Sequence, residues 1–162
     1  MNLLISRINT SGLITALLAG MGAAACITAL SYIGELGHGL WLMAPFGATM
    51  VILFGLPASP LAQPRNIVLG HLLTTAVGLG CLTLFGVHGW SLGLAVGLAV
   101  MLMMLTDTLH PPAGANPLLA MLTGASWHFL VTPVAVGVFT IVLFGYGYHR
   151  WVSGKPWPQR WF

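Results

Sequence analysis

Charged side chains are scarce in this 162-residue sequence, of which only 4% is Asp, Glu, Lys or Arg. A soluble domain of this size covers its surface with roughly 25% charged residues. The sequence is also 57% hydrophobic, which excludes intrinsic disorder because disorder requires low hydrophobicity. Lipid must therefore surround most of the folded chain, and we predict a single all-α, polytopic membrane domain over residues 1–162.

Acidic residues and cysteines are rare too, with two of each. The sequence has no GxSxG or HExxH motif, and a dinuclear metal centre would need more carboxylates. We therefore expect no enzyme and no bound metal or other cofactor. The five basic residues are spread along the chain and form no patch for nucleic acid. They fit better the ends of membrane segments, so the expected partner is the lipid bilayer.

Six apolar segments divide the chain, and a spanning helix needs roughly 20 apolar residues. Four segments approach this length, and two shorter ones are interrupted by proline and glycine. The four are residues 12–33, 67–87, 90–105 and 129–148, and the two interrupted ones are residues 40–56 and 109–122.

The two interrupted segments correspond to each other at a constant offset of 67 residues. The matched pairs include Pro45/Pro112, Gly47/Gly114, Ala48/Ala115, Ala58/Ala125, Ser59/Ser126, Gly70/Gly137, Gly78/Gly145 and Gly80/Gly147. This pattern predicts internal repeats over about residues 12–87 and 88–150, each a long helix, a broken or half helix and a long helix. Three crossings in each half make the two repeats inverted.

The charged residues orient these segments. If all six segments cross and the N-terminus is cytoplasmic, every basic residue lies on the cytoplasmic side, as the positive-inside rule requires. These residues are Arg7, Arg65, Arg150, Lys155 and Arg160, whereas Glu35 lies outside. If the broken segments only dip into the membrane and return, Arg65 moves outside. Residues 151–162 are expected to form an interfacial cytoplasmic tail.

The sequence also favours one kind of membrane. The sequence shows no Ser/Arg-rich transit extension, which favours a multi-pass protein of a bacterial inner membrane over a plastid precursor.

The region around His110 has the most unusual composition. Pro111 and Pro112 lack backbone N–H groups, and Gly114 permits close approach of another backbone or a ligand. A helix beginning near Ala115 would present its positive N-terminal end at membrane depth, which suits an anion. Residues 45–49 would do the same from the opposite side. The candidate anion-binding residues are Pro45, Gly47, Ala48, Thr49, His110, Pro112, Gly114, Ala115 and Asn116. The alternative is a mere kink filled by neighbouring side chains.

Four polar residues are candidates for gating or proton coupling. Asp107 and His110 lie three residues apart and share one face if the helix persists, which favours a proton relay; alternatively, Asp107 only caps a helix. Arg65 would attract an anion to the cytoplasmic mouth of a transport path, or it would only set the topology. His71 lies alone in a span and must find a partner.

One stretch of the sequence reads His110-Pro111-Pro112-Ala113-Gly114-Ala115. It resembles the signature that names the HPP family of small integral membrane proteins. Residues 44–48 and 59–66, followed by Gly70-His71, are similar to the family's first half, and the resemblance covers roughly residues 12–150. Family members have been linked to nitrite transport in plastids and cyanobacteria, and many have no assigned substrate.

The resemblance implies a small-anion transporter or channel, with nitrite as the favoured inorganic anion. The alternatives are a transporter of another small anion or of a cation, or a membrane assembly subunit that transports nothing. A homo-oligomer is possible in each case.

Overall fold

The computed structural model describes residues 10–37 and 42–161, and the regular elements within them are all helical, as the composition predicts. Three helical stretches are long and apolar enough to cross a membrane. These are α2 (Thr10–Leu36), α4 (Pro64–Phe85) and the run of η4 (Leu130–Ala135), α7 (Val136–Tyr148) and η5 (His149–Ser153), which is kinked at Thr132, where φ is −131° and ψ is 115°. The shorter elements are α3 (Ala44–Met50), η1 (Val51–Gly55), η2 (Pro60–Ala62), α5 (Gly89–Leu105), η3 (Pro111–Ala115) and α6 (Asn116–Leu122).

The two interrupted segments form short helical units of equal length. In the first, α3 has 7 residues and η1 has 5; in the second, η3 has 5 residues and α6 has 7. At 1.5 Å per residue each unit is only about 18 Å long, shorter than a hydrocarbon core of about 30 Å. Both units begin at or beside a proline. Proline is favoured in the first turn of a helix because the backbone N–H groups of that turn have no partner within the helix, so the absence of one costs no hydrogen bond.

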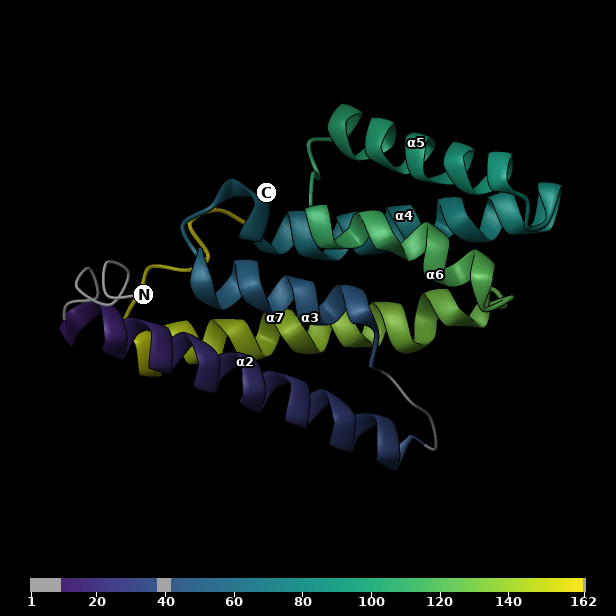
Figure 1. The fold of residues 1–162 in the computed structure, drawn as a ribbon. Coiled ribbons are helices and arrows are strands. Elements are labelled where there is room, and N and C mark those ends of the chain that lie inside the picture. Colours follow the sequence, from purple (N-terminus) through teal and green to yellow (C-terminus); the bar gives the residue numbers. More distant parts are fainter. Residues whose placement is uncertain (1–9, 38–41, 162) are drawn as a thin grey trace, which may run out of the picture.

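Consecutive segments run in alternating directions along one long axis (Figure 1). The start of α2, the loop before α4 and the C-terminal segment therefore lie toward one end of the molecule, and α5 runs in the direction of the same end. We call this the basic end because the segments that lie there carry Arg65 at the start of α4, Arg150 in η5, and Lys155 and Arg160 in the C-terminal segment. Glu35 belongs to the last turn of α2, which ends on the other side. Arg7 and Phe162 lie outside the described residues.

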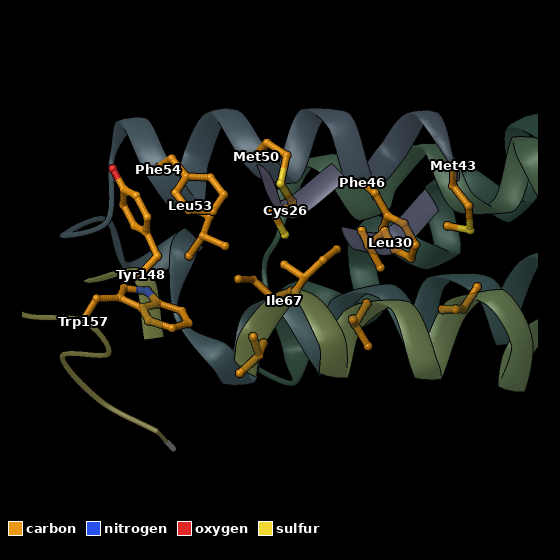
Figure 2. Packing of buried hydrophobic residues seen from close by; sticks show 14 residues of the cluster. Cys26, Leu30, Met43, Phe46, Met50, Leu53, Phe54, Ile67, Tyr148 and Trp157 are labelled. Atoms are coloured by element: carbon orange, nitrogen blue, oxygen red, sulfur yellow. The ribbon is translucent and has the colours of Figure 1, made fainter. Parts of the chain in front are cut away.

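The largest hydrophobic cluster lies between α2, the α3–η1 unit, α4 and α7 (Figure 2). Phe46, Leu53 and Phe54 are all buried in it. The close approach of α2 depends on Gly22, where an added Cβ atom would lie 2.8 Å from the Phe54 ring. Because the surrounding lipid is as apolar as these side chains, close van der Waals packing is what holds the helices together here, and not removal of the side chains from water.

The two cysteines belong to different clusters. Cys26 lies in the large cluster, and Cys81 packs in a second, smaller one with Ala95 and Met121. Both thiols are free and buried, so each is a small core residue, as their apolar surroundings in the sequence suggest.

Each long third helix packs against the short unit of the other half. A Cβ atom added to Gly70 of α4 would lie 3.6 Å from the Cβ atom of Ala113, and one added to Gly137 of α7 would lie 2.5 Å from the Phe46 ring. Gly70 and Gly137 are 67 residues apart, and so are Phe46 and Ala113. The same contact is therefore made twice, at corresponding positions.

Candidate functional site

A buried polar cluster lies where the two short units meet α4. It consists of Thr49 from α3, His71 from α4, His110 immediately before η3 and Asn116 at the start of α6, and we call these four residues the histidine cluster. Each of the four has an exposed fraction of 0%. Polar side chains this deep in an apolar protein are costly unless they are hydrogen-bonded, so their contacts decide what the cluster can do.

His71 is held at both nitrogen atoms of its ring. Its Nε2 atom lies 3.0 Å from Thr49 Oγ1, and its Nδ1 atom lies 2.9 Å from Asn116 Nδ2. Thr49 and Asn116 are 67 residues apart, which makes them corresponding residues of the two short units. The Phe46 ring contacts the same imidazole edge-on, with centroids 5.3 Å apart. One imidazole thus connects the two units at matched positions.

His110 extends the cluster toward the basic end. Its Nε2 atom lies 2.9 Å from Thr49 Oγ1, and its Nδ1 atom lies 2.8 Å from the carbonyl oxygen of Leu61 in η2. Gly70 makes room for this residue, because a Cβ atom there would lie 2.9 Å from the Cβ atom of His110.

The acceptors constrain the proton positions in the neutral cluster. A carbonyl only accepts, so His110 carries its proton on Nδ1 and its Nε2 atom is an acceptor. The single hydroxyl proton of Thr49 has two acceptors within reach, His110 Nε2 at 2.9 Å and the carbonyl oxygen of Pro45 at 3.1 Å, and the chain through the cluster is complete when it points to His110. Thr49 Oγ1 then accepts from His71 Nε2–H, and His71 Nδ1 accepts from the amide of Asn116. The result is a hydrogen-bonded chain in which every donor points the same way, from Asn116 to Leu61.

The nitrogen and the oxygen of the Asn116 amide differ in their hydrogen bonds. Its Nδ2 atom is also 3.1 Å from His71 O and 3.1 Å from Thr74 Oγ1, whereas its Oδ1 atom is buried without a hydrogen-bond partner. An unpaired buried acceptor costs about 1–3 kcal/mol. The cluster therefore holds one free acceptor, and the Nδ2 group of Asn116 and the ring and hydroxyl donors of the other three residues are all engaged.

The remaining residues of the two short units line a shallow surface groove. Pro45 and Ala48 of α3 face Pro112 and Ala115 across it, so the N-terminal parts of the two units lie side by side. The groove is apolar. Two prolines at the start of η3 have no N–H group to offer, and the Ala113 N–H donates to His110 O at 2.9 Å.

The two glycines of these units have room around them. A Cβ atom on Gly47 or Gly114 would meet nothing within 4 Å. The structure therefore separates the predicted anion-binding residues into three sets. Thr49, His110 and Asn116 join His71 in the buried cluster, whereas Pro45, Ala48, Pro112 and Ala115 line the groove. The two glycines are not among the lining residues of the groove, and Gly47 lines a separate hollow next to α2.

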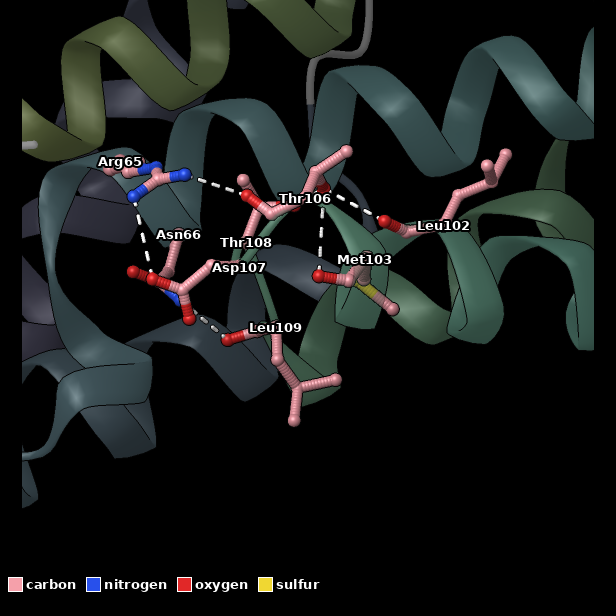
Figure 3. A network of polar contacts seen from close by, with 8 residues as sticks. All are labelled: Arg65, Asn66, Leu102, Met103, Thr106, Asp107, Thr108 and Leu109. Atoms are coloured by element: carbon pink, nitrogen blue, oxygen red, sulfur yellow. Dashed lines mark hydrogen bonds and ion pairs between the residues drawn. The ribbon is translucent and has the colours of Figure 1, made fainter.

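Asp107 and Arg65 form a separate pair at the basic end (Figure 3). Arg65 Nη1 lies 3.4 Å from Asp107 Oδ2, and Arg65 Nη2 donates to Thr106 O at 2.7 Å. The pair is open to the surroundings, with side-chain exposures of 31% for Arg65 and 71% for Asp107. An exposed ion pair contributes about 0–1 kcal/mol.

The expected pair of Asp107 with His110 is not formed. Their shared face depends on a helix that continues through both residues, but α5 ends at Leu105 and Asp107 has a φ of 54°. The chain turns there, so Asp107 faces Arg65 and His110 enters the cluster. Asn66 holds this loop, donating to the Leu109 carbonyl at 2.9 Å.

Several contact residues have no strong signal in the sequence. The C-terminal tail folds back onto the loop before α4: Trp157 Nε1 donates to Ala62 O at 2.9 Å, and Gln159 N donates to Gln63 Oε1 at 2.9 Å. The sequence predicts an interfacial tail here, and the structure adds that it covers η2 next to Leu61. Of these contact residues, Gln63 carries the only sequence signal: it is a single amide side chain between two apolar segments, where a polar group needs a hydrogen-bond partner.

A family model described as "HPP, transmembrane region" matches residues 8–158. The chain belongs to the HPP family. Two relatives are transmembrane proteins of Dictyostelium discoideum. One is 33% identical over 129 residues, covering 75% of this chain and 45% of the relative. The other is 32% identical over 131 residues, covering 76% of this chain and 42% of the relative.

The chain thus spans less than half the length of these curated relatives. No solved structure matches it. The family, the names of the relatives and the three long apolar helices agree that this is an integral membrane protein.

Proposed function

We propose that this HPP protein is a transporter of small anions and that the histidine cluster lies on its transport path. One observation carries the proposal: two short helical units from different parts of the chain meet at mid-molecule and hold a single imidazole between them. Paired broken helices in corresponding positions are typical of transporter binding sites. A purely structural kink would not need a matched polar residue in each unit.

We also propose that the two halves are inverted repeats. The alternating directions of the segments support this, since the first half then begins and ends in the direction opposite to the second. The repeated glycine contacts, Gly70 with Ala113 and Gly137 with Phe46, support it further. In such an arrangement His71 lies close to the pseudo-twofold axis, where rocking of one half against the other would expose it to either side.

Charge favours an anion over a cation. Four basic residues gather at one end of the molecule and would raise the local concentration of anions there. The hydrogen bonds of the histidine cluster involve imidazole, hydroxyl, amide and carbonyl groups and no carboxylate. Nitrite is the favoured substrate because members of the family have been linked to it, and a bacterial inner membrane is the proposed location.

The main alternative is an assembly subunit that transports nothing, alone or as a homo-oligomer. The apolar groove between α3 and η3 favours it, because its three alanines, Ala44, Ala48 and Ala115, would let a neighbouring membrane helix approach closely. Catalysis is not part of the proposal. Within the described residues no three His, Cys, Asp or Glu side chains come together as they would around a metal ion.

Flux through the purified protein in liposomes decides between these functions. Uptake of nitrite, nitrate, formate and chloride is measured near neutral pH, where little nitrite is in the neutral acid form that crosses lipid unaided. We expect nitrite uptake well above that of empty liposomes and lost in Asn116→Leu. The absence of flux for every anion, in protein that is folded and monodisperse, would leave the assembly subunit as the better description.

A further inference from the structure

We propose that His71 is a proton-binding site and that Thr49 and His110 relay its proton toward the basic end of the molecule. The inference rests on the proposed transport function, which it extends to proton coupling through named residues. It assigns that coupling to the buried cluster and not to Asp107, whose partner is Arg65 at 3.4 Å.

The relay has one continuous route. Hydrogen bonds of 3.0, 2.9 and 2.8 Å join His71 Nε2 to Thr49 Oγ1, Thr49 Oγ1 to His110 Nε2, and His110 Nδ1 to Leu61 O. When a proton binds His71 Nδ1, the Nε2–H proton can pass to Thr49 as Thr49 passes its own to His110 Nε2. His110, which is itself fully buried, then releases its Nδ1 proton to water once movement of the two halves opens the side next to Leu61. One proton enters and one leaves, and both rings end neutral.

The amide of Asn116 can respond to protonation of His71 Nδ1. In the neutral cluster its Nδ2 group donates to His71 Nδ1, while Oδ1 is buried without a partner. A proton on His71 Nδ1 turns that atom from an acceptor into a donor, so it needs an acceptor opposite. Rotation of the amide by half a turn brings Oδ1 to this place. The orphaned oxygen is thus the group that the protonated state would use.

Proton binding also prepares the cluster for an anion. In the neutral cluster every donor is already hydrogen-bonded, so none is available to an anion. A protonated imidazole, in contrast, carries a full positive charge, and the low dielectric constant of its surroundings strengthens the attraction of an anion to it. Among the described residues whose side chains contact the His71 ring (Phe46, Thr49, His110 and Asn116), His110 is the only titratable one, with ring centroids 5.1 Å apart. Arg65 and Asp107 lie beyond it at the basic end and neutralise each other. Proton and anion are therefore expected to move together.

The test compares three threonine variants in liposomes that contain a pH dye, with nitrite uptake and proton uptake measured together. Thr49→Val breaks the relay and keeps the shape, Thr49→Ser restores the hydroxyl, and Thr140→Val is the control because Thr140 only donates to the carbonyl of Val136 in its own helix. We expect Thr49→Val to lower uptake driven by a pH gradient about tenfold, the effect of losing one buried hydrogen-bond partner. Thr49→Ser should recover most of the uptake lost in Thr49→Val, and Thr140→Val should resemble the wild type. Nitrite and proton uptake in Thr49→Val that both equal those of the wild type would overturn the relay.

Nitrogen NMR of the histidines separates this inference from the transport function itself. At high pH we expect His71 to carry its proton on Nε2 and His110 on Nδ1, and on acidification His71 to become doubly protonated. Asn116→Asp places a fixed acceptor opposite Nδ1, so it should keep His71 doubly protonated at a pH where the wild type is neutral. His71 that stays neutral in both proteins down to the acid limit of folding would refute the proton site, whether or not nitrite is carried. A doubly protonated His71 in a protein without any flux would instead remove only the transport function.

Discussion

Two polar sites lie only a few residues apart along α4, and they differ in almost every physical respect. The histidine cluster is fully buried, uncharged and hydrogen-bonded between three segments of the chain. The Arg65–Asp107 pair is charged, exposed and held by a single loop. Burial makes each contact of the cluster expensive to lose, whereas solvent screens the ion pair. The residues with formal charge are therefore the less consequential ones here.

The largest effect should follow from removing the Asn116 amide from the histidine cluster. Asn116→Leu leaves His71 Nδ1 and the Thr74 hydroxyl without their donor, at a cost of about 1–3 kcal/mol for each unpaired group. We expect a lower unfolding temperature in detergent and no nitrite flux. Asn66→Leu is the matched control, since its amide holds only the Leu109 carbonyl near the basic end. Equal losses in both variants would mean that the cluster is no more important than the loop.

A glycine beside the cluster should show the next largest effect. Gly70→Ala puts a methyl group 2.9 Å from the His110 Cβ atom and 3.1 Å from Thr108 O, and such overpacking costs about 1–3 kcal/mol. We expect reduced flux and reduced stability. Gly80→Ala, in the same helix with nothing within 4 Å, should be neutral or stabilising by about 0.5–1 kcal/mol. Thermal unfolding of the two variants measures the difference.

A substitution in the second short unit should affect transport more than stability. Because a side chain at Gly114 meets no atom within 4 Å at its Cβ position, Gly114→Leu should fold and insert normally. We expect it to block flux by hindering the proposed movement of one half against the other. Full activity of this variant, measured at equal amounts of reconstituted protein, would place the path entirely within the cluster.

The smallest effect should come from the charged pair. Asp107→Asn removes an exposed ion pair worth about 0–1 kcal/mol and leaves Arg65 its bond to Thr106 O. The dependence of nitrite uptake on internal and external pH should match that of the wild type. A flattened pH profile in Asp107→Asn alone would restore Asp107 as the coupling group and remove the contrast between the two sites.

Much of the architecture was accessible from local patterns in the sequence. The scarcity of charge required a lipid environment, and proline and glycine marked where the two short units begin. The expected and observed bounds agree within a few residues; the second short unit was predicted at 109–122 and spans 111–122. Helix α4 begins at Pro64, three residues before the apolar run at 67–87, where the sequence Pro64-Arg65-Asn66 indicates a helix start because proline is well suited to the first turn. The offset of 67 residues also aligns Thr49 with Asn116, a match that singles out the two polar residues that hold His71.

The partners of the polar residues were decided by the tertiary structure alone. The spacing of Asp107 and His110 indicated a shared helical face, but the chain leaves the helix at Leu105 and Asp107 pairs with Arg65, 42 residues away. Likewise, the sequence required that His71 have a partner, and only packing of three segments brings Thr49 and Asn116 to its two nitrogens. Composition and short-range spacing determine which groups must be buried and where helices break, because those effects are local. Which buried groups meet depends on contacts between distant segments, and no local pattern records them.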